Sequence, residues 1–245
     1  MKITINKNQI TKKFLNPVSR LVDRCIIKVQ PDNISTLVHN EDNTIMLYGN
    51  LDIDTNLKDK EEIKLNIPDT KKLLRIFNCI NEENITLTVD SNSINYKSDD
   101  LSFKYFLLDD NILKSTAMNI DKINNFNFTN SFELTPNKLN EILKGSTFTT
   151  DSNKIYFFAK DDKMYGELTD KTISNIDSVT YLIADEYDGE EIKKIIPIDL
   201  EIFRMFSGLK MGTITVKINI DPPILMFTIN NKDITLKYII SSLVK

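Results

Sequence analysis

Apolar and polar residues alternate with a period of two over much of the chain, which is typical of β-strands buried on one face. Ile85-Thr86-Leu87-Thr88-Val89 is one such block. Comparable patterns predict strands at Lys2 to Ile5, Ser131 to Leu134, Lys154 to Phe158 and Lys163 to Leu168. The chain is therefore expected to consist mainly of short strands.

Four segments depart from this period and predict amphipathic helices. Two of them follow Pro68 and Pro197, and their apolar residues recur at the helical spacing i, i+3, i+4, i+7. These residues are Leu73, Ile76, Phe77 and Ile80, repeated as Ile202, Met205, Phe206 and Leu209. Two further helices are expected at about Lys7 to Leu15 and Pro136 to Lys144, because Asn6 and Thr135 supply N-cap chemistry and Pro136 suits a first helical position.

The chain contains an internal repeat. Residues 67–78 and 196–207 align without gaps at an offset of 129 residues (197 minus 68). Pro68, Arg75 and Phe77 match Pro197, Arg204 and Phe206 identically. The same offset carries residues 85–89 onto 214–218 and the chain start, residues 3–14, onto 132–143. Several matches in the same order indicate a tandem duplication.

The repeat defines the domain organisation. Phe103 to Phe106 resembles Leu236 to Ile239 at an offset of 133, and we place the four extra residues in the turn around Asp221-Pro222-Pro223. Residues 109–130 are rich in Asn, Asp, Ser and Thr. We therefore expect domains at 1–110 and 131–245 joined by a connector at 111–130, each domain carrying two helices flat on an antiparallel sheet.

The distribution of charge along the chain bears on DNA binding more than the net charge does. The net charge is −4 and the pI is about 5.2, whereas proteins that hold DNA by broad neutralisation are normally basic. Cations do gather on the polar sides of the expected helices, where they either keep the helices soluble or contact phosphates. The candidates are Lys7, Lys12, Lys13, Lys71, Lys72, Arg75, Lys138, Lys144, Arg204 and Lys210. Glu141 and Glu201 on two of those helices weaken the DNA interpretation.

No catalytic constellation can be assembled from the sequence. The chain has six glycines without a phosphate-binding loop, and its single histidine, His39, lies in a polar, loop-like stretch. Acidic pairs at expected turns leave a metal-dependent nuclease as an alternative from another class. These pairs are Asp99-Asp100, Asp109-Asp110, Asp161-Asp162 and Glu190-Glu191. We expect no metal and no cofactor.

Cysteine usage and hydropathy suggest an intracellular protein. Cys25 and Cys79 lie in apolar stretches and are expected to be reduced thiols of the core. The longest apolar runs are only a few residues, too short to cross a bilayer, and no secretory signal is evident. We expect a cytoplasmic protein with no membrane association.

The closing segment carries a resemblance to a known family. Residues 184–190, Ile196 and residues 211–216 are similar in order to the DNA polymerase sliding clamps of T-even phages, whose fold is shared with proliferating cell nuclear antigen. The resemblance implies an α+β DNA clamp fold in two repeated, ring-forming domains. It also implies a homotrimer around double-stranded DNA, in the host cytoplasm if the protein is viral. Strand pairing between neighbouring subunits is expected to use Leu101 to Leu108 and about Lys163 to Thr169.

The resemblance implies partners as well. They are a replicative DNA polymerase, a clamp-loader ATPase and, in T-even-like phages, the late transcription apparatus. A separate loader is expected because the chain has no nucleotide-binding loop. Apolar anchors for partner peptides are expected in the connector and tail, at Ile112, Leu113, Met118, Ile120, Ile240, Leu243 and Val244. The runner-up interpretation is a clamp-fold accessory or interaction subunit that forms no ring.

Overall fold

The computed structural model describes residues 1–55, 57, 61–113, 120–189, 192, 195–207, 209 and 212–242. Its contacts divide the chain into two compact units. Unit 1 comprises residues 1–123 with 231–236, and unit 2 comprises 124–230 with 237–245. The main division, after residue 123, lies inside the segment that the sequence marks as a connector.

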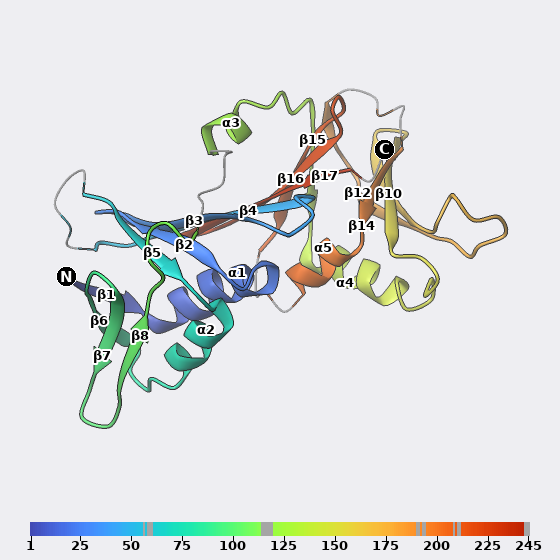
Figure 1. The fold of residues 1–245 in the computed structure, drawn as a ribbon. Coiled ribbons are helices and arrows are strands. Elements are labelled where there is room, and N and C mark those ends of the chain that lie inside the picture. Colours follow the sequence, from blue (N-terminus) through green and yellow to red (C-terminus); the bar gives the residue numbers. More distant parts are fainter. Residues whose placement is uncertain are drawn as a thin grey trace. The chain divides into compact units, whose positions relative to one another are not determined.

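Unit 1 contains two antiparallel sheets with helices (Figure 1). The first sheet has the order β1-β6-β7-β8. Its strands are β1 (Lys2–Asn6), β6 (Asn84–Val89), β7 (Ser93–Lys97) and β8 (Ser102–Phe106). The second has the order β4-β3-β2-β5. Its strands are β2 (Cys25–Val29), β3 (Asn33–His39), β4 (Ile45–Asp52) and β5 (Ile63–Ile67). Residues 231–236, which include the start of β17, group with unit 1, where β17 neighbours β4.

Unit 2 repeats this plan. One run of strands has the order β13-β9-β15-β16-β17, and the other has the order β12-β11-β10-β14. The first run comprises β9 (Asn130–Leu134), β13 (Asp188–Gly189), β15 (Ile214–Asn219), β16 (Ile224–Asn231) and β17 (Ile234–Ser241). The second comprises β10 (Lys154–Lys160), β11 (Lys163–Leu168), β12 (Val179–Ala184) and β14 (Ile196–Asp199). Apart from the short β13, each strand has a counterpart at the same position of unit 1.

The strand registers confirm the duplication at single-residue level. In unit 1, Ile3 pairs with Leu87 and Ile5 with Ile85. In unit 2, Phe132 pairs with Val216 and Leu134 with Ile214. All four unit 2 positions lie 129 residues after their counterparts, so the repeat seen in the sequence is a repeat of structure.

The expected placement of the four extra residues is only half right. Val89 pairs with Ile94 across the β6–β7 turn, and its counterpart Ile218 pairs with Leu225 across the β15–β16 turn. The offset there is 131 (225 minus 94), so the turn at residues 220–223 accounts for two residues. The other two enter after Leu225, where β16 and β17 are each longer than β7 and β8.

The helices lie where the amphipathic patterns place them, with one difference in length. The first helical segment continues past Leu15, as η1 (Gln9–Leu15) followed by α1 (Asn16–Leu21). Pro17 lacks a backbone N–H, and η1 is a wider π-type helix in which the Asn16 N–H reaches the Thr11 carbonyl. The helix therefore passes through the proline instead of stopping before it.

The remaining helices are α2 (Thr70–Asn78), α3 (Ile120–Asn124), α4 (Pro136–Gly145) and α5 (Glu201–Phe206). No pattern in the sequence predicts α3, whose residue Ile123 is fully buried although it belongs to the expected connector. Two further expectations were wrong. Cys79 is exposed rather than buried, because it follows Arg75 by four residues on the polar side of α2. His39 ends β3 rather than lying in a loop.

Aromatic side chains form the core of unit 2 and hold α5 in place. Phe206 packs against Tyr238 of β17 at a centroid distance of 5.0 Å and against Phe227 of β16 at 5.4 Å. Phe203 contacts Phe227 and also Phe157 of β10. Two phenylalanines on one short helix thus contact strands from both sheets of the unit, which fixes the direction of the helix's polar side.

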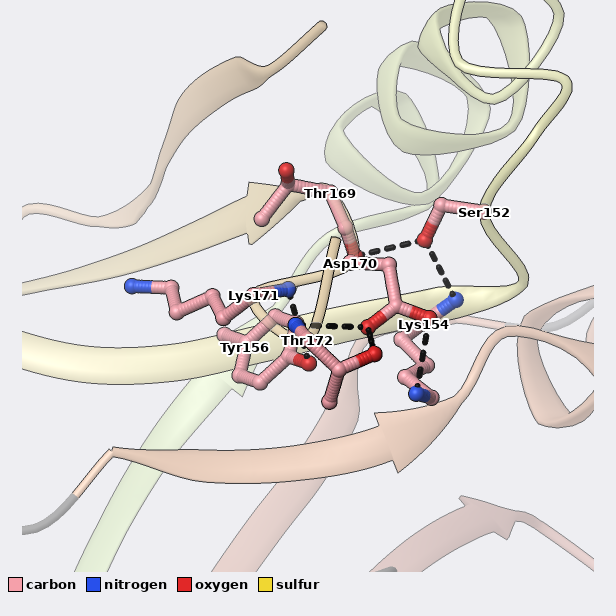
Figure 2. A network of polar contacts seen from close by, with 7 residues as sticks. All are labelled: Ser152, Lys154, Tyr156, Thr169, Asp170, Lys171 and Thr172. Atoms are coloured by element: carbon pink, nitrogen blue, oxygen red, sulfur yellow. Dashed lines mark hydrogen bonds and ion pairs between the residues drawn. The ribbon is translucent and has the colours of Figure 1, made fainter. Parts of the chain in front are cut away.

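A polar network closes the connection from β11 to β12 (Figure 2). Asp170 accepts a hydrogen bond from Lys154 Nζ at 2.8 Å and from the backbone N–H and side-chain hydroxyl of Thr172 at 3.0 and 2.7 Å. The Ser152 hydroxyl donates to the Thr169 carbonyl at 2.5 Å. The loop that leads into β12 is therefore fastened to β10 at its first residues.

This network predicts a pH dependence. The hydrogen bonds from Lys154 and then Thr172 lower the pKa of Asp170 from 3.8 to about 2. A carboxylate with a lowered pKa stabilises the fold above its ordinary pKa, and the contribution disappears as the pH falls towards about 2. We expect Asp170→Asn to lower the thermal midpoint at neutral pH and to converge with the unaltered chain between about pH 4 and pH 2. A constant difference across that range would contradict the assignment.

Candidate nucleic-acid interface

The helices of unit 1 are fixed by caps at their starts. Asn6 Oδ1 accepts hydrogen bonds from the backbone N–H groups of Asn8 and Gln9, as expected for an N-cap. Asp69 Oδ1 accepts from the Lys72 N–H at 2.7 Å and caps α2. η1 and α1 both contact α2. The two helical segments therefore lie side by side in one unit.

The polar sides of these helices carry only positive charge. Between residues 7–21 and 70–78 there are seven cations and no carboxylate. They are Lys7, Lys12, Lys13, Arg20, Lys71, Lys72 and Arg75. Lys12, Lys72 and Arg75 are exposed, and Lys13 is half-buried. The apolar sides face the core, where Leu73, Phe77 and the following Ile80 are buried. A dense cationic surface of this kind binds polyanions.

Lys7 and Lys71, among these seven cations, have neighbours that modify their role. Lys7 Nζ donates to the Ile80 carbonyl at 2.6 Å, close to the end of α2, so this side chain has a structural task. Lys71 pairs with Asp23 at 2.9 Å, but the two side chains are 62% and 72% exposed. Such exposed pairs contribute about 0–1 kcal/mol, so Lys71 can exchange Asp23 for a phosphate at little cost.

Arg20 and Arg24 were not among the sequence candidates. Arg20 belongs to α1 and Arg24 follows it, and both are exposed. They were missed because the helix was expected to end at Leu15. Continuing the helix through Pro17 would have found Arg20, since it lies two turns beyond Lys13.

The helices of unit 2 present a different electrostatic picture. Lys138 pairs with Glu141 on α4 at 2.9 Å. Arg204 pairs with Glu201 on α5 at 3.0 Å and donates to Asn153 Oδ1 at 2.9 Å. Lys144 is exposed, while Lys210 lies outside the described residues. Thr135 caps α4 as expected, accepting from the Lys138 N–H.

The matched arginines therefore differ in their surroundings. Arg204 is held by a carboxylate and an amide, and that amide also donates to Asp199 at 2.6 Å. Arg75 is exposed, and no carboxylate in the described part of the chain forms an ion pair with it. Identity at equivalent positions of the repeat does not give these two side chains the same availability.

Tyr105 connects the cationic helix to the edge strand β8. Its hydroxyl donates to the Asp69 carbonyl at 2.7 Å and accepts from the Asp69 N–H at 3.1 Å. Burial raises the pKa of Tyr105 to about 12. The start of α2 and β8 are therefore linked through one buried phenol.

We expect Tyr105→Phe to lower the free energy of unfolding by about 1–2 kcal/mol, because both hydrogen bonds to Asp69 disappear and its backbone groups stay partly covered. Urea denaturation measures the change. Tyr165→Phe is the matched control, since it also removes one hydroxyl while the ring can keep its stacking on Phe158. Equal effects of the two substitutions would show that the link to Asp69 contributes nothing specific.

Of the two segments expected to form the contact between subunits, one lies at the edge of its sheet and the other does not. β8 lies at the end of its sheet, which agrees with the expected segment Leu101 to Leu108. The other expected segment, Lys163 to Thr169, is wrong as an edge, because β11 pairs with β10 on one side and β12 on the other. The outer strand of that sheet is β12. On the other candidate strand, β8, Phe106 is 61% exposed.

The expected partner anchors are not equally accessible. Ile112 is 53% exposed, whereas Leu113 and Ile120 are half-buried. Ile240 is only 2% exposed and belongs to the core of β17, so it offers no anchor on the surface. Met118, Leu243 and Val244 lie outside the described residues.

The acidic pairs lie mainly at turns. Asp161 and Asp162 form the β10–β11 turn with positive φ values of 52° and 58°, a conformation that aspartate tolerates. Asp99 and Asp100 lie between β7 and β8, Asp109 and Asp110 follow β8, and Glu190 with Glu191 lies outside the described residues. Within the residues that the structure covers, no three His, Cys, Asp or Glu side chains are grouped to hold a metal ion. None of the described helices could cross a bilayer.

Comparisons with known proteins identify the fold. No sequence model of a protein family matches the chain, and no curated protein matches it. Among solved structures, A. fulgidus PCNA bound to the C-terminal region of FEN-1 superposes with a TM-score of 0.75 at 14% identity, covering 100% of this chain and 98% of that one. PCNA from Thermococcus kodakaraensis gives 0.75 at 13% identity, covering 98% and 99%.

A bacterial structure gives the same result over part of its length. The DNA polymerase sliding clamp from Bacillus subtilis superposes with a TM-score of 0.76 at 14% identity, covering 100% of this chain and 64% of that one. The chain therefore has the α+β clamp fold of PCNA and the sliding clamps.

Proposed function

We propose that the chain is one subunit of a DNA sliding clamp, a homotrimeric ring that encircles duplex DNA and keeps a replicative polymerase on it without catalysing a reaction. The observation that carries the proposal is a cationic helix surface, with seven cations and no carboxylate within residues 7–21 and 70–78, on a clamp fold whose chain is acidic overall, at net charge −4. Because an acidic exterior repels DNA, the DNA can approach the protein only at the cationic helix surface.

The repeat supports a specific way of closing the ring. In unit 1 the start of β17 neighbours β4. By the duplication, β8 is the counterpart of β17 and β12 the counterpart of β4, and both are outer strands of their sheets. Pairing β8 of one chain with β12 of the next would reproduce the β17–β4 arrangement. Repeated head to tail, this contact closes a ring, and the clamp resemblance gives three chains.

The chemistry of the cationic surface suits sliding. Exposed lysines meet phosphates as flexible point charges, and phosphates carry no sequence information. Lys12, Lys13, Lys72 and Arg75 are the side chains that we place against the DNA backbone. Binding of this kind is sensitive to salt and independent of sequence, so the ring's closure, not its affinity, must keep the protein on DNA.

The partners follow from the same role. We place the docking surface for polymerase peptides at the connector, around Ile112 and Leu113, where an exposed apolar side chain can anchor a partner. A clamp-loader ATPase is proposed to open the ring. The T-even-phage type, with a role in late viral transcription and action in the host cytoplasm, is proposed on the order of segments in residues 184–216 alone.

Encirclement can be tested without a loader. A closed ring threads onto linear duplex through its ends, so DNA with open ends should retain the protein and DNA with both ends blocked by streptavidin should not. The comparison is made at a salt concentration that suppresses direct binding. Equal retention on both DNAs would show that the protein does not encircle DNA. Equal absence would show that it forms no ring competent for threading.

A further inference from the structure

The repeated helices of the two units differ sharply in charge. Residues 7–21 and 70–78, which contain the helices η1, α1 and α2 of unit 1, carry seven cations and no carboxylate. α4 and α5 of unit 2 carry three cations, Lys138, Lys144 and Arg204, against Glu141 and Glu201. The duplication therefore preserved the backbone but left one helix pair strongly positive and the other close to neutral.

The geometry makes the second pair weaker than its cation count suggests. Glu141 Oε2 lies 2.9 Å from Lys138 Nζ, and Glu201 Oε2 lies 3.0 Å from Arg204 Nη1. Exposed pairs within one helix turn add little to the stability of the fold, so the carboxylates do not lock the cations in place. The carboxylates instead weaken the electrostatic field that the cations produce at a DNA phosphate. Two opposite charges at such a short separation act on a phosphate as a dipole, and water with salt screens that field within about 10 Å. The Lys71–Asp23 pair of unit 1 is equally short, at 2.9 Å, so Lys71 is left out when the cations of the two units are compared.

We infer that DNA is held mainly through unit 1, by phosphate contacts with the exposed cations of η1, α1 and α2, while the helices of unit 2 form a nearly neutral sector. The inference rests on the proposed function. In a ring of three chains it makes three basic sectors alternate with three neutral ones. The polyanion that this surface fits is the phosphate backbone of duplex DNA.

The test compares two matched double substitutions in the full chain. Lys72→Gln with Arg75→Gln removes two cations from α2. Lys138→Gln with Arg204→Gln removes two cations from α4 and α5. Both variants replace one lysine and one arginine on helix surfaces, and their native masses are checked first. The readout is the affinity for duplex DNA with open ends, measured at several salt concentrations.

We expect the unit 1 variant to bind at least about tenfold more weakly. The slope of log K against log [salt] should also become shallower, by about 0.9 for each phosphate that the variant no longer neutralises. The unit 2 variant is expected to keep the slope of the unaltered chain. Equal decreases in affinity and slope would overturn the inference while leaving encirclement intact. If the unaltered chain showed no end-dependent binding, the proposed function would fail and the inference with it.

A third variant gives a change in the opposite direction. Glu141→Gln with Glu201→Gln leaves Lys138 and Arg204 without their carboxylates. We expect tighter DNA binding and a steeper salt dependence, because two cations in each chain become available to phosphates. Unchanged binding would show that the carboxylates do not keep this sector neutral, which contradicts the inference even if both double neutralisations fail to fold.

Discussion

Phe106→Asp is expected to convert the trimer into single chains. Phe106 is 61% exposed on the outer strand β8, with Lys104 Nζ 5.0 Å from its ring centre. In the proposed contact, β12 of the next chain covers the phenyl ring of Phe106. An aspartate there would have to lose its water among apolar and half-buried side chains such as Tyr181 and Leu182, which costs several kcal/mol in each of three interfaces.

The control for this prediction is Ile112→Asp, which places the same charge on an exposed apolar site outside β8. It should leave the trimer intact. Sedimentation at about micromolar concentration distinguishes the two variants, and circular dichroism checks that each remains folded. A trimeric Phe106→Asp protein would exclude β8 from the interface. Dissociation of the Ile112→Asp protein would point to the connector instead.

Phe206→Ala is expected to destabilise unit 2 severely. The ring is 1% exposed and contacts Phe203, Phe227 and Tyr238. Replacing a buried phenylalanine with alanine costs about 3–5 kcal/mol through the reduced burial and the cavity that remains. Because the ring fixes α5, the polar side of that helix should also lose its orientation.

Phe206→Leu is the matched control, since it keeps most of the volume and should cost no more than about 1.5 kcal/mol. Denaturant unfolding gives both values, and unit 1 supplies an internal comparison through Phe77→Ala, which replaces the equivalent residue of the repeat. If both substitutions cost less than about 1.5 kcal/mol, the packing of Phe206 would not be what holds α5.

The repeat offset predicted most of the fold because it combines many weak signals. A single apolar alternation cannot distinguish one strand from another, but matches at Pro68, Arg75 and Phe77 determine the register of the second half as far as β15. The paired strands confirm this register, because the Ile3–Leu87 pair of unit 1 is equivalent to the Phe132–Val216 pair of unit 2. The amphipathic periods likewise predicted the buried and exposed sides of α2 and α5.

What the sequence did not predict depends on contacts between distant residues. The first helix was expected to end at Leu15, yet a π-type segment lets it continue past Pro17 and adds Arg20 to the cationic surface. α3 has too few residues for a periodic pattern. The bond from Lys7 to the Ile80 carbonyl joins positions 73 residues apart. Such contacts are formed by the fold and leave no local signal.

The candidate DNA-binding residues show the same division. The cations could be read from helix periodicity, and Glu141 and Glu201 were visible beside them. The difference between Arg75 and Arg204 was not visible in full, because the Arg204 contact to Asn153 spans 51 residues. Equivalent positions in a repeat share a backbone location, whereas the charge that a side chain presents depends on its neighbours.

The native mass in solution tests the central claim most directly, because a ring of clamp units requires several chains. Sedimentation equilibrium of the unaltered protein at about micromolar concentration should give three times the chain mass of 28.3 kDa. A mass of one chain that persists at that concentration would contradict the ring and favour a clamp-fold subunit that acts alone.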